Sequence, residues 1–543
     1  MLDPTCGSGA FLFASLNILE PLYEACIERM EQFTAEAPRK YKFFHEVLAE
    51  VNSEEHPNLR YYIYKTIILN NLYGVDIMRE AVEIAKLRLF LKMVGSVDMN
   101  LRKPNFGLEP LPDIDFNIRA GNTLVGFATE EELKNAIQYD EDGNMRLDFG
   151  GKLEIFKEEC QIVATAFRRF QDAQLITDKG EDTHKKAKAE LQSRLDALNE
   201  KLNLYLASIY GIDKNSIPDE KKFKKKYEEW RTSHQPFHWF AEFYEIINER
   251  GGFDVIIGNP PYVEYSKVRN DYQINGYFLL KTGNLFSICA ERFLRLKNIH
   301  QSAIGIIVPI SSVSTPRMVP MLSIMQKKST NLFISTYAVR PAKLFNGVDM
   351  NLTIFLGIKN DRGNSFTSTT NYLRWYEDNR SNLFSTLYYR SGKDKIENMM
   401  PKIGDKNGYN IFKKSISFNN NLAKLQTTKM DDTYETIYYH SGGRYFRKCI
   451  KERLSNEYKP LNIPINSADS IICLLSSSLY YYLWIAISDT FHVTKGYINF
   501  LTVPDTLLHD KHITSVCDKL LQSLKSHAER RIRNRADGTV QKK

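Results

Sequence analysis

The feature that most restricts the fold is an apolar run at 253–258, which has the length of a β-strand and stops at a rigid polar turn. The turn reads Asn259-Pro260-Pro261-Tyr262. A short apolar run bounded by turn residues is typical of a strand buried on both faces. In α/β proteins, ligands bind at the loops that follow the carboxyl ends of such strands. The sequence therefore predicts an α/β fold whose site includes this turn.

A glycine-containing turn near the start of the chain is a second predicted ligand-binding turn of an α/β fold. Residues 3–11 read Asp-Pro-Thr-Cys-Gly-Ser-Gly-Ala-Phe and lead into a stretch, 14–30, with helical spacing of apolar side chains. Gly7 and Gly9 let a ligand approach backbone N–H groups at the start of a helix. The turn lacks the Gly-Lys-Ser/Thr ending of a nucleoside triphosphate loop. We therefore expect it to hold a nucleotide-type cofactor of another kind.

Two further units have the same strand-and-turn pattern. The first has a predicted strand over 67–75, Asp76 at its end and a predicted helix over 79–94. A carboxylate in this position can accept hydrogen bonds from both ribose hydroxyls of a nucleotide; the sequence equally allows Asp76 to cap the helix that follows. The other, 116–124, predicts a short strand followed by a polar turn at Asn122.

The remaining chain divides into an insertion and a second domain. Residues 128–250 are charged and helical, and a heptad-like seam predicts a packed helix pair; its members are Leu191, Leu195, Leu198, Leu202 and Tyr205. The strand and helix pattern resumes at 251 and fades after 360. We therefore expect 1–127 and 251–360 to form one α/β domain with a doubly wound sheet, 128–250 to be a helical insertion, and 361–543 to be an α+β domain.

Composition narrows the class of protein. A hydrophobic share of 43% with 25% charged residues predicts a folded globular protein. The seven cysteines are scattered without a Cys-x-x-Cys pair, so we expect no metal site and no disulfide framework. A net charge of +8, with 30 Tyr and 31 Phe, suits a polyanionic partner. We expect neither a signal peptide nor a membrane-spanning stretch of roughly 20 apolar residues, hence a cytoplasmic protein without a membrane partner.

The Asn-Pro-Pro-Tyr turn has the chemistry to hold a planar exocyclic amine. The Asn259 side-chain oxygen and the Pro260 carbonyl are two acceptors, which the prolines hold in place by restricting the backbone. Gripping both amine protons directs the nitrogen lone pair at an electrophile, and Tyr262 can stack on the ring. The alternative is a proline-rich turn that a tyrosine merely packs.

Together the four segments resemble motifs I to IV of the S-adenosylmethionine-dependent amino-methyltransferases. The segments are 3–11, 74–76, 121–124 and 259–262, in the order of the family. Their order and the helical insertion are similar to the Eco57I-like branch of the γ-class DNA adenine-N6 methyltransferases of restriction-modification systems. The resemblance is close over about 1–360 and loose beyond. It implies a Rossmann-like class I methyltransferase domain followed by a target-recognition domain.

The resemblance also implies a role for each site residue. S-adenosylmethionine would be bound by Asp3, Pro4, Thr5, Cys6, Gly7, Ser8, Gly9 and Phe11 at its methionine part, by Asp76 at its ribose and by Asn122 at its adenine, where the family often has Asp. Asn259, Pro260, Pro261 and Tyr262 would be catalytic, and Tyr262 and Phe345 would stack on a target adenine flipped out of double-stranded DNA. In the C-terminal domain, Arg444, Arg447 and Lys448 would contact DNA.

One departure from the family leaves other interpretations open. The family places a strand and an aromatic-containing motif X before the glycine turn, whereas only Met1 and Leu2 precede it here. We therefore expect a truncated or split enzyme, with a separate chain that supplies this region, or a restriction subunit, as a partner. One alternative is a DNA-binding subunit that is catalytically incomplete. Another is a protein glutamine methyltransferase, against which the large segment after Lys359 argues.

Overall fold

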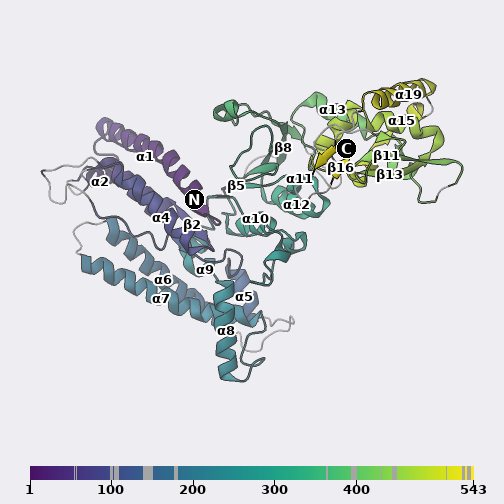
Figure 1. Cartoon of the computed structure of the whole chain (residues 1–543). Coiled ribbons are helices and arrows are strands. Elements are labelled where there is room, and N and C mark those ends of the chain that lie inside the picture. Colours follow the sequence, from purple (N-terminus) through teal and green to yellow (C-terminus); the bar gives the residue numbers. More distant parts are fainter. Residues whose placement is uncertain are drawn as a thin grey trace. The chain divides into compact units, whose positions relative to one another are not determined.

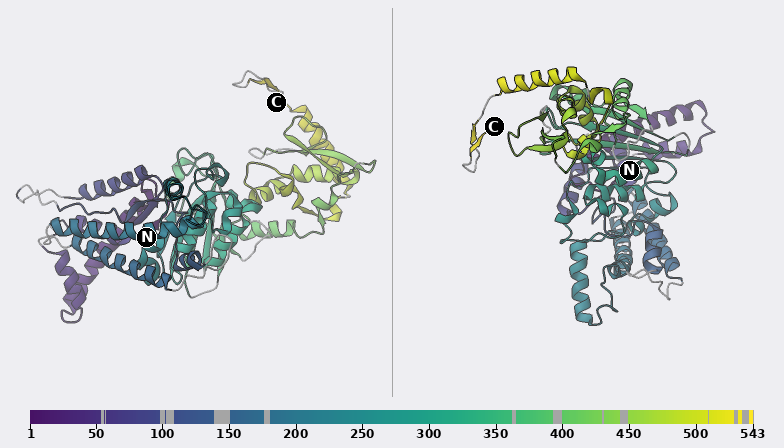
Figure 2. Two further views of the ribbon diagram at one scale, coloured as in Figure 1. Left: turned by 90° about the horizontal axis from the view of Figure 1, so that it is seen from below. Right: turned by 90° about the vertical axis from the view of Figure 1, so that its right-hand side faces the viewer.

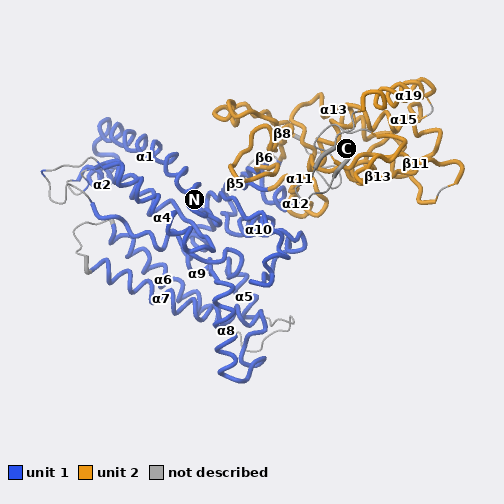
Figure 3. The backbone as a smooth tube through the Cα atoms, viewed as in Figure 1, with its two compact units in different colours: residues 1–308, 323–332, 355–365 blue, residues 309–322, 333–354, 366–543 orange. Residues whose placement is uncertain are grey.

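The computed structural model describes the chain except for residues 54–55, 57, 98–101, 103–108, 139–150, 176–180, 362–364, 393–399, 430, 443–448, 509, 529–531, 535–539 and 543. The chain forms two compact units (Figure 3). Unit 1 comprises 1–308, 323–332 and 355–365, and unit 2 comprises 309–322, 333–354 and 366–543. Each unit is built from segments that are discontinuous in the sequence. The four predicted domain boundaries stay predictions.

A large sheet organises the α/β part of the chain, with strand order β3-β2-β1-β4-β5-β7-β6-β8-β9. The strands are β1 (Leu2–Asp3), β2 (Tyr73–Asp76), β3 (Ile118–Ala120), β4 (Val255–Gly258), β5 (Ser302–Pro309), β6 (Asn331–Tyr337), β7 (Leu352–Lys359), β8 (Phe366–Leu373) and β9 (Arg390–Gly392). The five strands from β3 to β5 run parallel to one another, whereas β8 and β9 are antiparallel. The predicted mixed α/β fold with a large, mostly parallel sheet is confirmed.

Helices α1 (Ala10–Glu36), α3 (Leu59–Asn71) and α4 (Arg79–Val94) pack together beside the first strands (Figure 1). They share a core that includes Leu12, Leu16, Ile67, Ala85 and Leu89. A further helix, α2 (Lys42–Val51), lies against α1. α10 (Leu285–Leu296), which follows the helical insertion in the sequence, is buried along almost its whole length. The predicted helix over 79–94 is confirmed.

The predicted strand over 67–75 was wrong in its first half. Residues 67–71 end α3, and β2 begins only at Tyr73. Ile67, Ile68 and Leu69 are fully buried within the helix. A short apolar run satisfies a buried helix as well as a buried strand, because neither then has an exposed polar face to reveal its period.

The charged segment after β3 is helical, as predicted. Its helices are α5 (Glu130–Gln138), α6 (Lys152–Leu175), α7 (Glu181–Ser208), α8 (Glu220–His234) and α9 (Trp239–Glu242), followed by a π-helical turn over Glu245–Glu249. α6 and α7 lie side by side (Figures 1 and 2). The predicted seam is confirmed, because its four leucines are buried in the shared core and Tyr205 packs against it.

Unit 2 continues into an α+β arrangement. The strands β12 (Cys449–Ile450), β11 (Tyr434–His440) and β13 (Tyr458–Pro464) form an antiparallel sheet in that order. Its core is shared with α13 (Lys406–Ser415), α15 (Ile465–Leu475), α16 (Ser478–Ile487) and α19 (Lys511–Ser526). The shorter elements are α11 (Ser311–Ser314), α12 (Val319–Lys328), α14 (Leu422–Leu425), α17 (Lys495–Asn499), α18 (Asp505–Leu508), and the strand pairs β10 (Asn420–Asn421) with β14 (Thr502–Val503) and β15 (Ile532–Asn534) with β16 (Val540–Lys542).

Helix α1 is long and apolar enough to cross a membrane, judged by length and composition alone. The bent pair α15 and α16 would meet the same test only if counted as one span. The expectation that no stretch reaches this length and hydropathy was therefore wrong for α1. The helix also carries a buried charge, because the Glu20 carboxylate accepts a hydrogen bond of 2.6 Å from the Tyr64 hydroxyl and pairs with Arg60.

Candidate active site

Two turns far apart in the sequence begin at the same edge of the sheet. β1 pairs in parallel with β2 on one side and with β4 on the other, so that Leu2 lies opposite both Tyr73 and Ile256. β2 and β3 follow β1 on one side of the sheet, and β4 and β5 follow on the other side. The direction in which successive strands are added therefore reverses between β1 and β4. Ligands of open α/β sheets bind at the carboxyl ends of strands beside such a reversal. The glycine turn follows β1 there, and the Asn-Pro-Pro-Tyr turn follows β4.

Gly258 brings these two turns into direct contact. A Cβ atom at this position would lie 3.0 Å from Thr5 Oγ1 and 2.7 Å from the Phe293 ring. A side chain would therefore separate the end of β4 from both the glycine turn and α10. In the structure these two segments therefore lie together.

The two glycines of the first turn have different roles. Both adopt a positive φ, 49° at Gly7 and 76° at Gly9. A Cβ at Gly9 would lie 2.9 Å from Ala85 Cβ, so this glycine allows α4 to pack against the start of α1. A Cβ at Gly7 would meet no atom within 4 Å. Gly7 therefore borders open space, where a ligand could approach the backbone.

Asp76 ties the glycine turn to the end of β2. Its Oδ2 accepts a hydrogen bond of 2.8 Å from the Gly7 N–H, and its Oδ1 accepts one of 2.9 Å from the Met78 N–H. The N-cap of α4 is Met78, without a side-chain cap. The alternative in which Asp76 caps α4 is thus wrong, and the role of Asp76 in holding a ribose stays a prediction.

Asp3 is a buried carboxylate in the centre of this edge. Its side chain is 1% exposed and accepts a hydrogen bond of 3.1 Å from the Thr5 N–H. Burial, with a smaller contribution from the negative charge of Asp76, raises the pKa of Asp3 from 3.8 to about 8. A carboxyl group in such a place is neutral at pH 7 unless a cation approaches it. A cation beside Asp3 would favour the ionised form of this carboxyl group.

The other residues of the glycine turn are placed as follows. Cys6 is buried, and its N–H donates a 3.0 Å hydrogen bond to the Val75 carbonyl; burial raises the pKa of its thiol well above the usual range. The Pro4 carbonyl accepts a hydrogen bond from the Thr123 hydroxyl. Ser8 is exposed, and its carbonyl accepts a 2.8 Å hydrogen bond from Arg88. Phe11 is half-buried on the first turn of α1. Buried Thr5 Oγ1 has no hydrogen-bond partner among the described residues.

The loop after β3 reaches the same edge through Thr123 and Asn122. The Asn122 N–H donates a 2.8 Å hydrogen bond to the Gln235 carbonyl, and its Oδ1 accepts one of 3.0 Å from the Leu124 N–H. Its Nδ2 is buried and lacks a hydrogen-bond partner in the part of the chain that the structure describes. An amide donor left unsatisfied by the protein is available to a ligand.

Sequence reasoning missed the segment that holds this loop. Gln235, in the left-handed region with a φ of 45°, starts a stretch that runs alongside the loop after β3. The Phe237 N–H donates a 2.8 Å hydrogen bond to the Val125 carbonyl, and Trp239 Nε1 donates one of 3.2 Å to the Thr123 carbonyl. No local pattern indicates this return, because the pairing joins residues more than 100 positions apart. In the sequence, the one trace of this return was the cluster of aromatic residues that follows α8.

In the Asn-Pro-Pro-Tyr turn, Asn259 is exposed and Tyr262 is half-buried. The Tyr262 hydroxyl lies 2.5 Å from Asn259 Oδ1 and 3.2 Å from the Ile307 carbonyl oxygen of β5. Burial raises the pKa of Tyr262 above its usual range, so the hydroxyl stays protonated and can donate. The tyrosine thus positions the asparagine side chain that was predicted to grip an amine. Pro260 is buried and Pro261 is exposed.

The remaining predicted residues are not joined to this site by the structure. Phe345 is half-buried in a loop of unit 2, whereas Tyr262 belongs to unit 1. Arg444, Arg447 and Lys448 lie outside the described residues. Among the residues that are described, no group of three or more His, Cys, Asp or Glu side chains could hold a metal ion.

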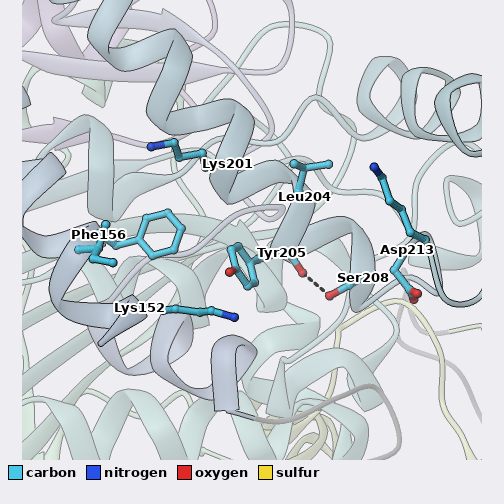
Figure 4. A pocket seen from close by; sticks show the side chains of 9 residues that line it. Lys152, Phe156, Lys201, Leu204, Tyr205, Ser208 and Asp213 are labelled. Atoms are coloured by element: carbon cyan, nitrogen blue, oxygen red, sulfur yellow. Dashed lines mark hydrogen bonds between the residues drawn. The ribbon is translucent and has the colours of Figure 1, made fainter. Parts of the chain in front are cut away.

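A separate hollow of about 610 Å³ lies in the helical insertion (Figure 4). Phe156 and Tyr205 meet edge to face there, with ring centroids 5.5 Å apart, and the Ser208 hydroxyl donates a 2.8 Å hydrogen bond to the Tyr205 carbonyl. The lining also includes Lys152, Lys201 and Lys214. None of the predicted site residues lines this hollow.

The chain is similar in sequence to known proteins. Residues 70–331 match the family described as Eco57I restriction-modification methylase. Over 289 residues the chain is 34% identical to a protein of Methanocaldococcus jannaschii named "Putative type II restriction enzyme and methyltransferase RM.MjaORFECS2P". That alignment covers 48% of this chain and 22% of the relative, so the chain spans less than a quarter of the relative's length.

Similar solved structures are more distant. A nuclease-deletion mutant of the Type ISP restriction-modification enzyme LlaGI, in complex with a DNA substrate mimic, is 11% identical with a TM-score of 0.35, over 81% of this chain and 26% of that one. The Type IIL restriction-modification enzyme MmeI in complex with DNA is 11% identical with a TM-score of 0.28, over 93% of this chain and 96% of that one. At such TM-scores the likenesses carry no weight for function. Over residues 70–331 the chain is therefore similar in sequence to the Eco57I restriction-modification methylase family.

Proposed function

We propose that this chain is the DNA methyltransferase component of a restriction-modification or related phage-defence system, and that it transfers a methyl group from S-adenosylmethionine to N6 of an adenine flipped out of double-stranded DNA. One observation carries the proposal. The Asn-Pro-Pro-Tyr turn, which suits an exocyclic amine, lies at the same sheet edge as the glycine turn, where Gly258 lets it approach Thr5.

The side chains at this edge fit S-adenosylmethionine. When bound, this cofactor supplies an electrophilic methyl group on a positively charged sulfur. Asp3 is a buried carboxyl group for which no salt bridge occurs among the described residues, so the positive charges of the cofactor would stabilise its ionised form. The unsatisfied Thr5 hydroxyl and Asn122 amide would find partners in the polar groups of the same ligand. Asp76, whose Oδ2 accepts a hydrogen bond from the Gly7 N–H, would also accept from ribose hydroxyls.

The substrate amine would be held by Asn259 Oδ1 and the Pro260 carbonyl. The Tyr262 hydroxyl shares its single hydrogen between Asn259 Oδ1 and the Ile307 carbonyl of β5, and so helps to hold the asparagine oxygen in position. An amine whose two protons are both engaged presents its lone pair in one direction. Such positioning can lower a reaction barrier by several kcal/mol without a general base.

The proposal of adenine as the target follows from the resemblance of the four motifs to adenine-N6 methyltransferases. Adenine N6 is paired within a duplex, so the base must leave the stack before the amine can reach Asn259. Tyr262 and Phe345 are the proposed walls for the flipped base, and Arg444, Arg447 and Lys448 are proposed contacts to DNA.

The proposal can be tested with isotope-labelled S-adenosylmethionine and long unmethylated duplex DNA. Wild type is compared with Asn259→Ala and with Asn17→Ala, a control at an exposed asparagine of α1. We expect label on adenine N6, a loss of about 100-fold or more in Asn259→Ala, and no change in Asn17→Ala. Cofactor binding, measured by equilibrium dialysis, should be retained in both variants.

Other outcomes point to other functions. Label on cytosine would refute adenine as the target while keeping DNA methylation. Label on glutamine of an added protein, with none on DNA, would favour protein methylation. Cofactor binding absent from the wild-type chain, together with DNA binding, would favour a catalytically incomplete DNA-binding subunit.

A further inference from the structure

The loop after β3 is held by two side chains to which the proposed reaction assigns no role. The Leu124 carbonyl accepts a hydrogen bond of 2.8 Å from the Tyr277 hydroxyl and one of 3.4 Å from Arg292 Nη2. The same Arg292 nitrogen donates a 3.0 Å hydrogen bond to the Gly126 carbonyl. Burial raises the pKa of Tyr277 above its usual range, so its hydroxyl stays protonated and can donate. Two main-chain carbonyls of this loop are therefore bound by donors from α10 and from the connection that precedes it.

Arg292 is a buried cation, 2% exposed, in an ionic network within unit 1. Its Nη1 lies 3.2 Å from Glu132 Oε2, and Arg295 Nη1 lies 2.6 Å from Glu132 Oε1. The Glu132 carboxylate also accepts a 2.7 Å hydrogen bond from the Ala128 N–H. Arg292 Nε is buried and has no hydrogen-bond partner in the described part of the chain. Because buried ion pairs add little stability over apolar side chains of similar volume, we expect the main effect of this network to be on the geometry of the loop.

Tyr277 is held firmly enough to act as a fixed donor to this loop. It is buried in the connection that runs from the Asn-Pro-Pro-Tyr turn to α10. The guanidinium groups of Arg292 and Arg295 lie 5.1 and 4.6 Å from the centre of its ring. Arg295 also donates a 2.7 Å hydrogen bond to the carbonyl of Gly276, which precedes the tyrosine. The Tyr277 hydroxyl therefore reaches Leu124 from a support that the ionic network fixes.

The backbone of Leu124 determines which atom of Asn122 remains available. The Leu124 N–H donates a 3.0 Å hydrogen bond to Asn122 Oδ1, and the Val125 N–H donates one of 3.1 Å to the Asn122 carbonyl. Leu124 is thus held at its carbonyl by Tyr277 and Arg292, and at its N–H by the asparagine side chain. With its oxygen engaged in this way, the Asn122 amide leaves Nδ2 buried and unpaired among the described residues. Asn122 is therefore set as a hydrogen-bond donor.

We infer that Tyr277 and Arg292 are positioning residues for the cofactor, which fix the loop after β3 so that Asn122 Nδ2 donates a hydrogen bond to a ring nitrogen of the adenine of S-adenosylmethionine. A ring nitrogen of adenine is an acceptor, whereas its exocyclic amine is a donor and would suit a carboxylate at this place. The inference rests on the proposed function, which assigns the adenine of the cofactor to Asn122. It adds the polarity of that contact and the two residues that set it.

The test is a double-mutant cycle on cofactor affinity, measured on the full chain without DNA by equilibrium dialysis of labelled S-adenosylmethionine. The variants are Tyr277→Phe, Asn122→Ala and the two together. Tyr61→Phe is the matched control, because Tyr61 is buried in the same unit and its hydroxyl donates a 2.9 Å hydrogen bond to the Pro110 carbonyl. Asn122→Asp tests the polarity of the contact, and Tm reports the stability of each variant.

We expect Tyr277→Phe to raise the dissociation constant of S-adenosylmethionine about 3- to 10-fold, the worth of one hydrogen bond, while Tyr61→Phe stays within about twofold of wild type. In the Asn122→Ala background, Tyr277→Phe should have no further effect, because the hydroxyl acts through that side chain. Asn122→Asp should bind the cofactor at least as weakly as Asn122→Ala, since a carboxylate offers no donor to a ring nitrogen. Arg292→Lys keeps the charge but loses the fork of donors, so it should weaken binding at least as far as Tyr277→Phe.

The outcomes separate this inference from the proposed function. If the wild type binds the cofactor and Tyr277→Phe binds it as well as the control does, the inference alone is wrong. A loss of affinity that persists in the Asn122→Ala background would show a general effect on the fold and would also overturn it, as would tighter binding by Asn122→Asp. A wild-type chain that binds the cofactor but methylates no adenine would refute the proposed function and leave the inference standing, whereas one that binds no cofactor would refute both.

Discussion

Replacing Asp3 by asparagine should stabilise the cofactor-free protein above pH 5 while weakening cofactor binding. The carboxyl group is 1% exposed, and burial raises its pKa to about 8 from 3.8. Between these two pKa values the folded state holds a proton that the unfolded state has lost. The free energy of unfolding therefore falls as the pH rises, by about 1.4 kcal/mol per pH unit. The accumulated cost reaches about 4 kcal/mol at pH 7, as an upper value.

Asparagine has nearly the same shape as the protonated acid, and its oxygen can still accept from the Thr5 N–H. Asparagine does not titrate, so the loss of stability with rising pH disappears. The assay is denaturant unfolding of cofactor-free wild type and Asp3→Asn at pH 5, 6, 7 and 8. We expect the variant to gain stability over wild type by about 1.4 kcal/mol for each pH unit from pH 5 to 7, and by less from pH 7 to 8, where the folded carboxyl group begins to ionise. Its affinity for S-adenosylmethionine should fall, since the carboxylate that would face the cofactor's positive charge is gone.

Asp115→Asn is the control with the opposite sign. The pKa of Asp115 is lowered from 3.8 to about 2: burial, the largest effect, raises it, but hydrogen bonds from Lys188 and Lys86 outweigh that. Its contribution to stability is present above pH 4 and is lost only as the pH falls towards 2. Asp115→Asn should therefore lower stability by the same amount at every pH from 5 to 8. If the free energies of unfolding of wild type and Asp3→Asn change with pH in parallel, Asp3 is ionised in the folded protein. That result would refute the reasoning.

Further predictions concern the turns that meet at the sheet edge. Tyr262→Phe removes the hydroxyl that positions Asn259 Oδ1 and should lower kcat about tenfold without changing cofactor affinity, as measured by labelled methyl transfer and equilibrium dialysis; unchanged kcat would show that Asn259 needs no such support. Gly9→Ala, with its Cβ 2.9 Å from Ala85 Cβ, should destabilise the fold by about 1–3 kcal/mol in denaturant unfolding. Gly7→Ala meets no atom within 4 Å and should cost about 1 kcal/mol from its positive φ alone, while weakening cofactor binding; equal effects of the two alanines on stability would contradict the separate roles.

Local pattern was sufficient for much of the α/β part. The helix over 79–94 follows from apolar periodicity, and the leucine seam of α7 follows from heptad spacing. These features depend on neighbours a few residues away, so a single sequence contains the information. The same rules failed at 67–71, where Ile67, Ile68 and Leu69 are all fully buried and their apolar run fits a helix as well as a strand.

The amino-acid sequence by itself determined the chemistry that this chain can offer: a glycine turn, acidic strand ends and an Asn-Pro-Pro-Tyr turn, in the order of a methyltransferase. Only the tertiary structure decided how these groups act on one another. Parallel pairing of β1 with β4 brings Thr5 next to Gly258, and the return of the chain at Gln235 closes the loop around Asn122. It also buries Asp3, which raises its pKa. Such effects depend on packing between distant segments and on desolvation, which no local pattern of residues records.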